Sequence, residues 1–214
     1  MTILITGATR GIGAGLAEHY KDQGHEVFGT GRSPMADIQL DVTHPHDHSA
    51  MAASLGDRAL DLLVCNAGVY LDKHDDLETG FGADLWAHSF ATNVTGVFLA
   101  IQALLPHLRR AQSPKIAIIS SQMASSELAP GGSYIYRASK AAALNLGRNL
   151  ATDLKGEGIA VGIYHPGWVQ TSMGGNMAAI TVDEAVMGLV DRFAALDIAT
   201  TGCFETWEGR AHPY

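Results

Sequence analysis

The sequence predicts one α/β domain with a single doubly wound parallel sheet, and three observations lead to this prediction. The chain has 214 residues, of which 47% are hydrophobic, enough for one sizeable core. Short apolar runs alternate with longer runs of helical periodicity, an order typical of βαβ units. No repeat, low-complexity tract or linker interrupts this alternation. Residues 1–214 are therefore expected to form one domain.

The expected elements follow one another in the order of a Rossmann-type sheet, with about seven strands and helices on both faces. Apolar or β-branched runs predict strands at residues 2–6, 25–30, 37–42, 59–67, 115–121, 159–167 and 202–207. Helical spacing of apolar side chains, with glycine or proline near the ends, predicts helices at residues 11–23, 84–110, 136–155 and 182–196.

The connection between the second and third strands is unusually short. Only about seven residues, 31–37, separate them, whereas a parallel crossover normally takes a dozen or more residues and includes a helix. Either a helix is missing here or the third strand is displaced. We expect the missing helix.

Composition and charge argue against several classes of function. The net charge is −8 and no run of Lys or Arg occurs, so no nucleic-acid partner is expected. No basic leader precedes the first apolar run, and no uninterrupted apolar run approaches the roughly 18 residues of a membrane span. We therefore expect a cytoplasmic protein without a membrane partner.

The cysteines and the clustered histidines favour no metal site. Cys65 and Cys203 form no CxxC pair, so two reduced thiols are expected, with a disulfide as the alternative. The histidines of HPHDH alternate in a loop leading into a helix, which is not a zinc spacing. Metal binding by His44, His46 and His48 is the weaker alternative.

A glycine-rich turn, TGATRGIG, follows the first predicted strand and opens the first helix. Glycine at positions 7, 11 and 13 lets backbone N–H groups approach a pyrophosphate at a helix N-terminus. The spacing is GxxxGxG rather than GxGxxG, and a merely tight turn is the alternative. In this context the turn predicts a dinucleotide site.

The end of the second strand favours NADP(H) over NAD(H). An acidic residue there selects NAD, but this chain has Arg32 and Ser33 and no acid. Arg10 in the glycine turn adds a second guanidinium, and two such groups suit a phosphate. The alternative is that both arginines are solvated on the surface.

An ordered set of motifs resembles the short-chain dehydrogenase/reductase family over nearly the whole chain. The set consists of TGATRGIG, CNAG at 65–68, Asn93, Ser120-Ser121, YRASK at 136–140 and HPGWVQT at 165–171. HPGWVQTSMGG and the ending GCFETWEGRAHPY are similar to its C-factor and sniffer-like carbonyl reductase branch.

The resemblance implies an enzyme that transfers a hydride between NADP(H) and a small carbonyl or alcohol substrate. Reduction of an apolar aldehyde or ketone is the expected direction. The alternative is an NADP-binding sensor or C-factor-like signalling protein on the same fold. An NAD-linked alcohol oxidiser is a third reading, against which Arg32 argues. Tetramers are frequent in the family and smaller assemblies occur in this branch, so the oligomeric state stays open, with a homodimer and a homotetramer as the candidates.

The resemblance makes Tyr136 the proton donor and Lys140 its partner. An unperturbed tyrosine has a pKa near 10, so phenolate chemistry near neutral pH needs a drop of about 3 units, or roughly 4 kcal/mol. Residues i and i+4 share a helix face, so the Lys140 ammonium can supply attraction of that sign. Tyr134 has alanine at i+4 and is expected to be a pocket wall or a packed aromatic.

Ser121 and Asn93 complete the catalytic set that the resemblance implies. Ser121 would orient the substrate oxygen, although Met123 occupies the position that the serine takes in many members. Ser120, Ser125 and Ser126 are alternatives. Asn93 lies inside the long predicted helix, where asparagine competes for backbone hydrogen bonds. Its expected role is a local distortion whose carbonyl holds a water beside Lys140, and the alternative is an exposed polar residue.

The remaining expected site residues divide into two groups. Met123, Tyr134, Trp168 and Met173 are expected to flank an apolar substrate, including an aromatic one. The expected cofactor contacts are Gly7, Thr9, Arg10, Gly11, Ile12, Gly13, Arg32, Ser33, Asp41, Val42, Asn66, Ala67, Gly68, Tyr136, Lys140, Pro166, Gly167, Val169 and Thr171.

Overall fold

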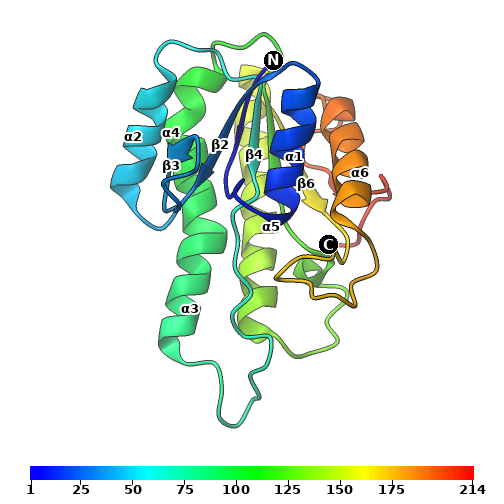
Figure 1. Cartoon of the computed structure of the whole chain (residues 1–214). Coiled ribbons are helices and arrows are strands. Elements are labelled where there is room, and N and C mark those ends of the chain that lie inside the picture. The colour runs from blue at the N-terminus through cyan, green and yellow to red at the C-terminus, as the bar shows by residue number, and fades with distance from the viewer.

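A computed structural model describes residues 1–214 and contains one sheet of seven parallel strands (Figure 1). The strand order is β3-β2-β1-β4-β5-β6-β7, which confirms the predicted doubly wound α/β fold. The order reverses between β1 and β4, where open α/β sheets bind their ligands. The strands are β1 (Thr2–Ile5), β2 (Glu26–Gly31), β3 (Ile38–Gln39), β4 (Leu62–Cys65), β5 (Lys115–Ile119), β6 (Ala160–His165) and β7 (Phe204–Thr206).

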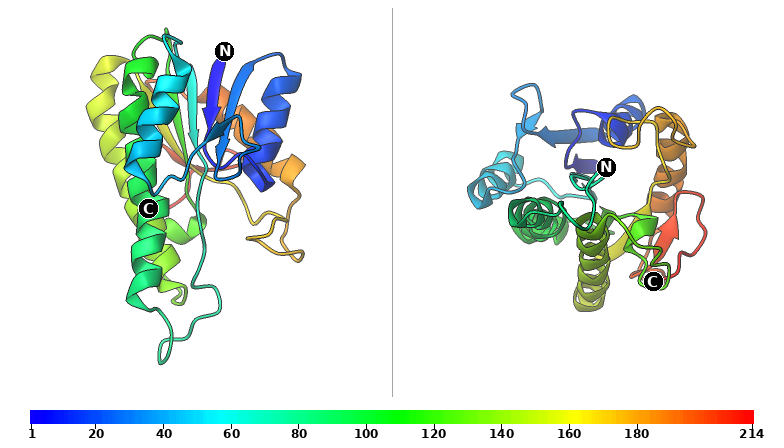
Figure 2. Two further views of the ribbon diagram at one scale, coloured as in Figure 1. Left: turned by 60° about the vertical axis from the view of Figure 1, so that its left-hand side comes forward. Right: turned by 90° about the horizontal axis from the view of Figure 1, so that it is seen from below.

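The structure has six α-helices, five of which cover the two faces of the sheet, while α3 extends beyond its edge (Figure 2). α1 and α6 pack together on one face, and α2, α4 and α5 cover the other. The side chains of β1 alternate between the two cores: Ile3 and Ile5 pack with α1 and α6, and Leu4 packs on the opposite side. The helices are α1 (Gly11–Asp22), α2 (Pro45–Leu55), α3 (Ala83–Phe90), α4 (Gly96–Leu108), α5 (Tyr134–Leu154) and α6 (Val182–Ala195).

No helix joins β2 to β3, as the short connection predicts. Their register explains why so few residues suffice. Ile38 pairs with Thr30 and Gln39 with Gly31, so β3 starts beside the end of β2 and the chain need not return along the whole strand. Asp37 secures the connection, because its carboxylate accepts hydrogen bonds from Gly29 N (2.9 Å) and Lys21 Nζ (3.1 Å).

The structure corrects three of the predicted elements. The third strand has two residues instead of the six of 37–42. The predicted helix 84–110 is a continuous run of α3, a π-helical segment (Ala91–Thr95) and α4, with Pro106 inside it. α2 starts at Pro45, so His46 and His48 lie in a helix rather than in the loop before it. A strand or helix ends where its backbone loses its hydrogen-bond partners, and the local sequence pattern does not show that point. The observed ends of these elements therefore differ from the predicted ones.

The helical run Ala83–Leu108 is long and apolar enough, by length and composition, to cross a membrane. In this fold Val97, Ile101 and Leu104 lie in the core beside the sheet. The two cysteines are free: Cys65 is buried in β4, and Cys203 is half-buried before β7. Cys65 packs as a small apolar group, as expected for this residue.

Candidate active site

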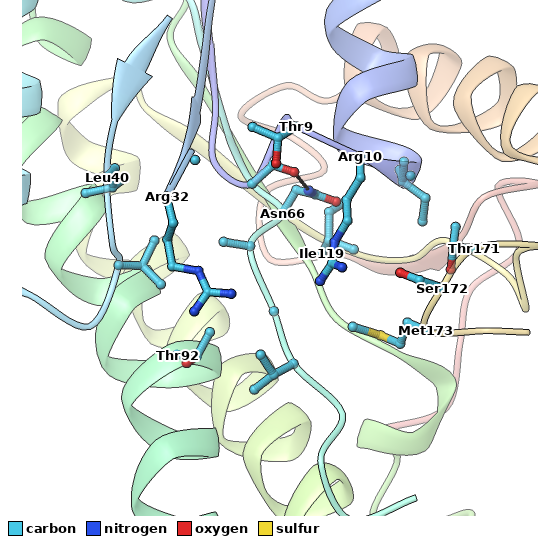
Figure 3. A pocket seen from close by; sticks show the side chains of 18 of the residues that line it. Thr9, Arg10, Arg32, Leu40, Asn66, Thr92, Ile119, Thr171, Ser172 and Met173 are labelled. Carbon is cyan, nitrogen blue, oxygen red and sulfur yellow. Dashed lines mark hydrogen bonds between the residues drawn. The ribbon is translucent and has the colours of Figure 1, made fainter. Parts of the chain in front are cut away.

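A pocket of about 440 Å³ opens at the carboxyl ends of the central strands (Figure 3). This is the edge where the strand order reverses. Segments from the whole length of the chain meet there because parallel strands all end on the same side of the sheet. Of the residues expected from the sequence, the pocket wall contains Gly7, Thr9, Arg10, Gly11, Ile12, Arg32, Ser33, Asp41, Val42, Asn66, Ala67, Gly68, Tyr136, Lys140, Pro166, Thr171 and Met173.

The glycine turn is held against the end of β4. Asn66 Nδ2 donates to the carbonyls of Thr6 and Gly7, each at 3.0 Å. Thr6 Oγ1 accepts in return from Asn66 N at 3.0 Å and from Ala67 N at 3.1 Å. A Cβ at position 13 would lie 2.3 Å from Gly7 O, so only glycine permits this approach. Gly13 thus lies behind the turn rather than in the pocket wall.

The start of α1 is suited to an anion. Arg10 precedes the helix without a side-chain cap, and the first turn contains no acidic residue. The first N–H groups of a helix have no partner within the helix, so they are available to a ligand. The residues present therefore fit the pyrophosphate of a dinucleotide.

Two guanidinium groups border the same pocket. The side chains of Arg10, directly before α1, and Arg32, directly after β2, point into it (Figure 3). Neither takes part in an ion pair with an acidic side chain. Gln39 Nε2 donates to the Arg32 carbonyl at 3.2 Å and so ties the end of β2 to β3. Both charges remain available to a phosphate.

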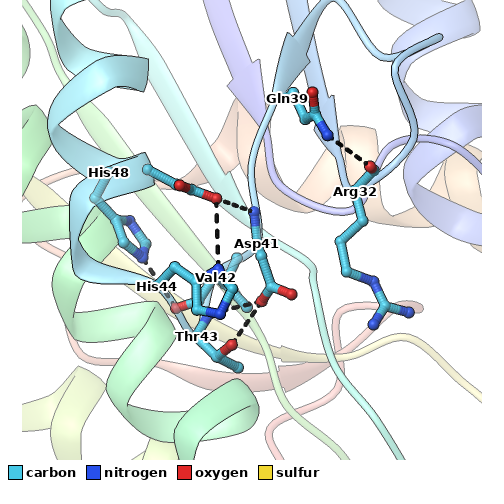
Figure 4. A network of polar contacts seen from close by, with 8 residues as sticks. Arg32, Gln39, Asp41, Val42, Thr43, His44 and His48 are labelled. Carbon is cyan, nitrogen blue, oxygen red and sulfur yellow. Dashed lines mark hydrogen bonds and ion pairs between the residues drawn. The ribbon is translucent and has the colours of Figure 1, made fainter.

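A polar network fixes the segment after β3 (Figure 4). Asp41 Oδ1 accepts from Thr43 N at 3.0 Å and Thr43 Oγ1 at 2.7 Å. Asp47 Oδ2, from the first turn of α2, accepts from Asp41 N at 2.9 Å. His48 Nε2 contacts Val42 O at 2.9 Å. The HPHDH residues therefore support the pocket wall at Asp41 and Val42, and no group of three or more His, Cys, Asp or Glu is placed to hold a metal ion.

Tyr136 and Lys140 lie buried on one face of α5, at 8% and 5% exposure. Lys140 Nζ is 5.7 Å from the centre of the Tyr136 ring and donates to Ile119 O at 2.9 Å. Burial raises the pKa of Tyr136 to about 12, opposed by a hydrogen bond with Ser121. Burial also lowers the pKa of Lys140 to about 8. The Tyr136 pKa therefore moves opposite to the expected direction, because desolvation outweighs the lowering effect of the Ser121 hydrogen bond.

Asn93 is fully buried in the π-helical segment between α3 and α4. Its amide donates to Val69 O and Ser139 Oγ, each at 2.9 Å, and its Oδ1 accepts from Val69 N at 2.8 Å. The helix is thus distorted at Asn93, and the exposed alternative is wrong. A π-turn disturbs the i→i+4 ladder locally, which frees a backbone carbonyl for another partner.

Among the four serines considered, Ser121 interacts with Tyr136. Ser120 Oγ donates to Lys140 O at 3.2 Å and so satisfies the backbone of α5. Ser125 Oγ donates to Tyr214 O at 3.1 Å. Ser126 is exposed. Ser121 is thus the serine that contacts Tyr136, whereas Ser120 is the one that lies in the pocket wall, and the role of Ser121 toward the substrate stays a prediction.

The expected substrate residues do not all reach the pocket. Met173 lines it, whereas Met123, Tyr134 and Trp168 lie outside its wall. Trp168 is 53% exposed, and its Nε1 donates to Gly174 O at 2.9 Å. Tyr134 packs edge-on against Phe81 with ring centres 5.1 Å apart. Gly167 and Val169 are likewise outside the wall and shape the loop behind it.

Several residues of the pocket wall were not predicted from the sequence, because they belong to no recognisable motif. Leu40 and Ile119 are ordinary apolar residues at strand ends, and His88 and Thr92 are one helical turn apart before Asn93. The i, i+4 spacing of His88 and Thr92 was the one available signal. The others are Gly31, Thr43, Val69 and Ser172.

The chain matches the short chain dehydrogenase family over residues 1–180. C-signal of Myxococcus xanthus is 34% identical over 170 residues, which cover 77% of this chain and 99% of that protein. The NADPH-bound carbonyl reductase from chicken fatty liver is 31% identical, with a TM-score of 0.91 over 100% of this chain and 98% of that chain. Carbonyl reductase Sniffer of D. melanogaster is 25% identical, with a TM-score of 0.92 over 100% of this chain and 99% of that one. The expected branch is confirmed, and the chain belongs to the short-chain dehydrogenase family.

Proposed function

We propose that this protein is an NADP(H)-dependent reductase of apolar aldehydes or ketones, with Tyr136 as the proton donor. The observation that carries the proposal is a buried Tyr136–Lys140 pair in the same pocket as an uncapped helix start. One part of the pocket offers groups that suit a dinucleotide. Another offers a proton donor. Two similar solved structures are described as carbonyl reductases, one with NADPH bound.

The pocket residues have distinct tasks toward the cofactor. The N–H groups at the start of α1 would hold the pyrophosphate. Arg32 and Arg10 would hold the 2′-phosphate that distinguishes NADP from NAD. Asp41 and Val42 would meet the adenine, and Thr171 the carboxamide. The absence of an acid at the end of β2, where Arg32 and Ser33 stand, supports NADP(H) over NAD(H).

Bound NADPH supplies a hydride for the carbonyl carbon of the substrate. The Tyr136 hydroxyl gives its proton to the carbonyl oxygen, so the product is an alcohol and the tyrosine is left as phenolate. A pKa of about 12 keeps Tyr136 protonated at neutral pH, which is the form that a proton donor needs. Lys140, with a pKa of about 8, is close enough to stabilise the phenolate that forms.

Ser121 and Asn93 support this transfer. The Ser121 hydroxyl lies beside Tyr136 and would orient the substrate oxygen by a hydrogen bond. The distorted helix at Asn93 would leave a carbonyl to hold a water beside Lys140 and return a proton to the site. Met173 gives the wall its apolar character toward the substrate.

The test is oxidation of NADPH and NADH by the purified protein over a panel of aldehydes, ketones and quinones. Tyr136→Phe should lower kcat about 100-fold or more while NADPH binding is retained, because only the acidic proton is lost. Tyr20→Phe is the matched control, since Tyr20 is buried in the core on the α1 side of the sheet and is not part of the pocket wall. Full turnover by Tyr136→Phe would exclude Tyr136 as the donor.

A second candidate is an NADP-binding sensor or signalling protein, which the 34% identity to C-signal favours. Tight NADPH binding without turnover of any panel compound would support it. The buried Tyr136–Lys140 pair argues for the enzyme, since a sensor does not need a proton donor. A homodimer or homotetramer and a cytoplasmic location remain predictions.

A further inference from the structure

The start of α5 is capped by a residue from a distant segment. Asp72, in the loop between β4 and α3, is only 1% exposed. Its carboxylate accepts from Ile135 N at 2.9 Å and from Tyr136 N at 3.2 Å. Ser133 occupies the usual cap position but makes no capping hydrogen bond, and its φ is +47°. The backbone of the proton donor is therefore held by Asp72.

A buried carboxylate is costly unless its oxygens are satisfied. Here the helix N-terminus supplies both the hydrogen bonds and a favourable dipole. A serine or threonine next to the helix would cap it as well without burying a charge. The contribution particular to Asp72 is the link between the β4–α3 loop and the backbone at Tyr136.

An aromatic contact makes the same link through side chains. The Tyr70 ring stacks on the Tyr136 ring, with centres 4.2 Å apart and planes at 22°. The Tyr70 hydroxyl is hydrogen-bonded to Ser133 Oγ. Phe81, at the far end of the loop, packs on Tyr134. Tyr136 is thus held at its backbone by Asp72 and on its ring by Tyr70.

We propose that Asp72 is a positioning residue for the reduction. It fixes the Tyr136 hydroxyl in the place where it can react, and its negative charge acts on the proton that Tyr136 transfers to the substrate. This inference rests on the proposed function. A proton donor must stay within hydrogen-bond reach of the substrate oxygen, and small displacements cost much of the rate. Holding both the helix start and the ring restricts such displacements.

The charge of Asp72 provides a readout that a purely structural cap would not. The titratable groups beside Tyr136 are Lys140 on its own helix and Tyr70 and Asp72 on the loop. After burial, Tyr70 and Asp72 both raise the pKa of Tyr136. Removing the Asp72 charge should therefore lower that pKa. The loss of reductase activity at alkaline pH should then begin at a lower pH.

The experiment compares Asp72→Ala, Asp72→Asn and the control Asp76→Ala in the full chain. Asp76 is on the same loop and carries the same charge, but its carboxylate accepts hydrogen bonds only from nearby Glu78 and Thr79. For each variant we measure kcat, KM, NADPH affinity and the pH profile of kcat. All measurements are made below the thermal unfolding midpoint of that variant, so that the protein is folded. Asp72→Ala should lower kcat by about tenfold or more with NADPH affinity unchanged. Asp72→Asn should lose less, because one carbonyl oxygen still accepts.

Two outcomes would overturn the proposal. One is a folded Asp72→Ala protein with the kcat of the wild type or of Asp76→Ala. The other is a pH profile of kcat for Asp72→Asn in which activity is lost at the same alkaline pH as in the wild type. If Asp72→Ala does not fold, Asp72→Asn decides by the same two criteria. Absence of turnover by the wild type would instead refute the proposed function, so the two failures are distinguishable.

Discussion

At the carboxyl ends of β1, β2 and β4, the pocket wall consists mainly of backbone and short side chains tied together by hydrogen bonds. Beyond β5 and β6, the corresponding elements are long loops with large exposed side chains, including Trp168 at 53%, Leu128 at 50% and Met177 at 85% exposure. Backbone contacts bind groups that many proteins share, whereas exposed side chains on loops distinguish between substrates. We therefore predict that the first region, the cofactor region, binds the cofactor and that the second, the substrate region, determines specificity.

A single hydrogen bond between Lys73 and Met173 links the loop after β4 to the segment after β6. Lys73 Nζ donates to Met173 O at 3.3 Å, and the bond joins two exposed loops. By contrast, Asn66 makes two 3.0 Å bonds to the glycine turn. The cofactor region should therefore respond sharply to substitution. The substrate region should respond by small changes in KM.

The largest effect is expected from Gly13→Ala. The added Cβ would lie 2.3 Å from Gly7 O and 2.5 Å from Asn66 Nδ2, so the turn must shift. NADPH affinity should fall by about 100-fold or more, because overpacking of this kind typically costs 1–3 kcal/mol and here it also moves the binding groups. Calorimetric titration measures the effect, with Gly156→Ala as the control, since nothing lies within 4 Å of its Cβ. Equal affinities would show that the turn is not rigid.

The next effect concerns stability in acid, at the end of β6. Burial, with a smaller contribution from His212, lowers the pKa of His165 from 6.5 to about 4. Between these values the unfolded state binds more protons, so stability rises with pH and is lost as pH falls from 6.5 to 4. The free energy of unfolding should fall by roughly 3 kcal/mol over this range. His165→Asn should flatten the pH dependence of denaturant unfolding, whereas exposed His46→Asn should leave it unchanged.

A smaller effect is expected from Arg32→Ala, which removes one guanidinium from the pocket. NADPH affinity should fall by about tenfold, the value of one charge-assisted contact, and NADH affinity should change little. Fluorescence titration with both nucleotides provides the measurement. Arg148→Ala is the control, because Arg148 stacks over Tyr214 outside the pocket. Equal losses for the two nucleotides would mean that Arg32 does not bind the phosphate.

The smallest effect is expected from Trp168→Ala, in the substrate region. More than half of this side chain is exposed and it lies outside the pocket wall, so NADPH affinity should not change. KM for large apolar substrates should rise by about two- to fivefold, since partial loss of apolar contact costs under about 1 kcal/mol. Steady-state kinetics over the carbonyl panel measures this. A tenfold change in NADPH affinity would contradict the division into two regions.

Much of the cofactor region could be predicted from the sequence. Asp41, Asn66 and Thr171 all reach the pocket wall, because each follows a strand and parallel strands end on one side of the sheet. Prediction was weaker for the substrate region. Trp168 lies in the irregular segment after β6, and Tyr134 directly follows an irregular loop. The path of such a loop cannot be predicted from the periodicity of the sequence.

The pKa of Tyr136 shows the same limit. The i, i+4 spacing correctly places Lys140 on its helix face, but spacing carries no measure of burial. At 8% exposure, desolvation dominates and the shift is upward.

The sequence by itself determined the α/β class, the missing helix between β2 and β3 and the glycine turn, because these depend on residues close together in the chain. Only the tertiary structure decided the strand order, the contact between Ser121 and Tyr136 and the cap that Asp72 places on Tyr136. Asp72 and Tyr136 are 64 residues apart. Such contacts depend on which strands and loops become neighbours, and local propensity does not contain that information.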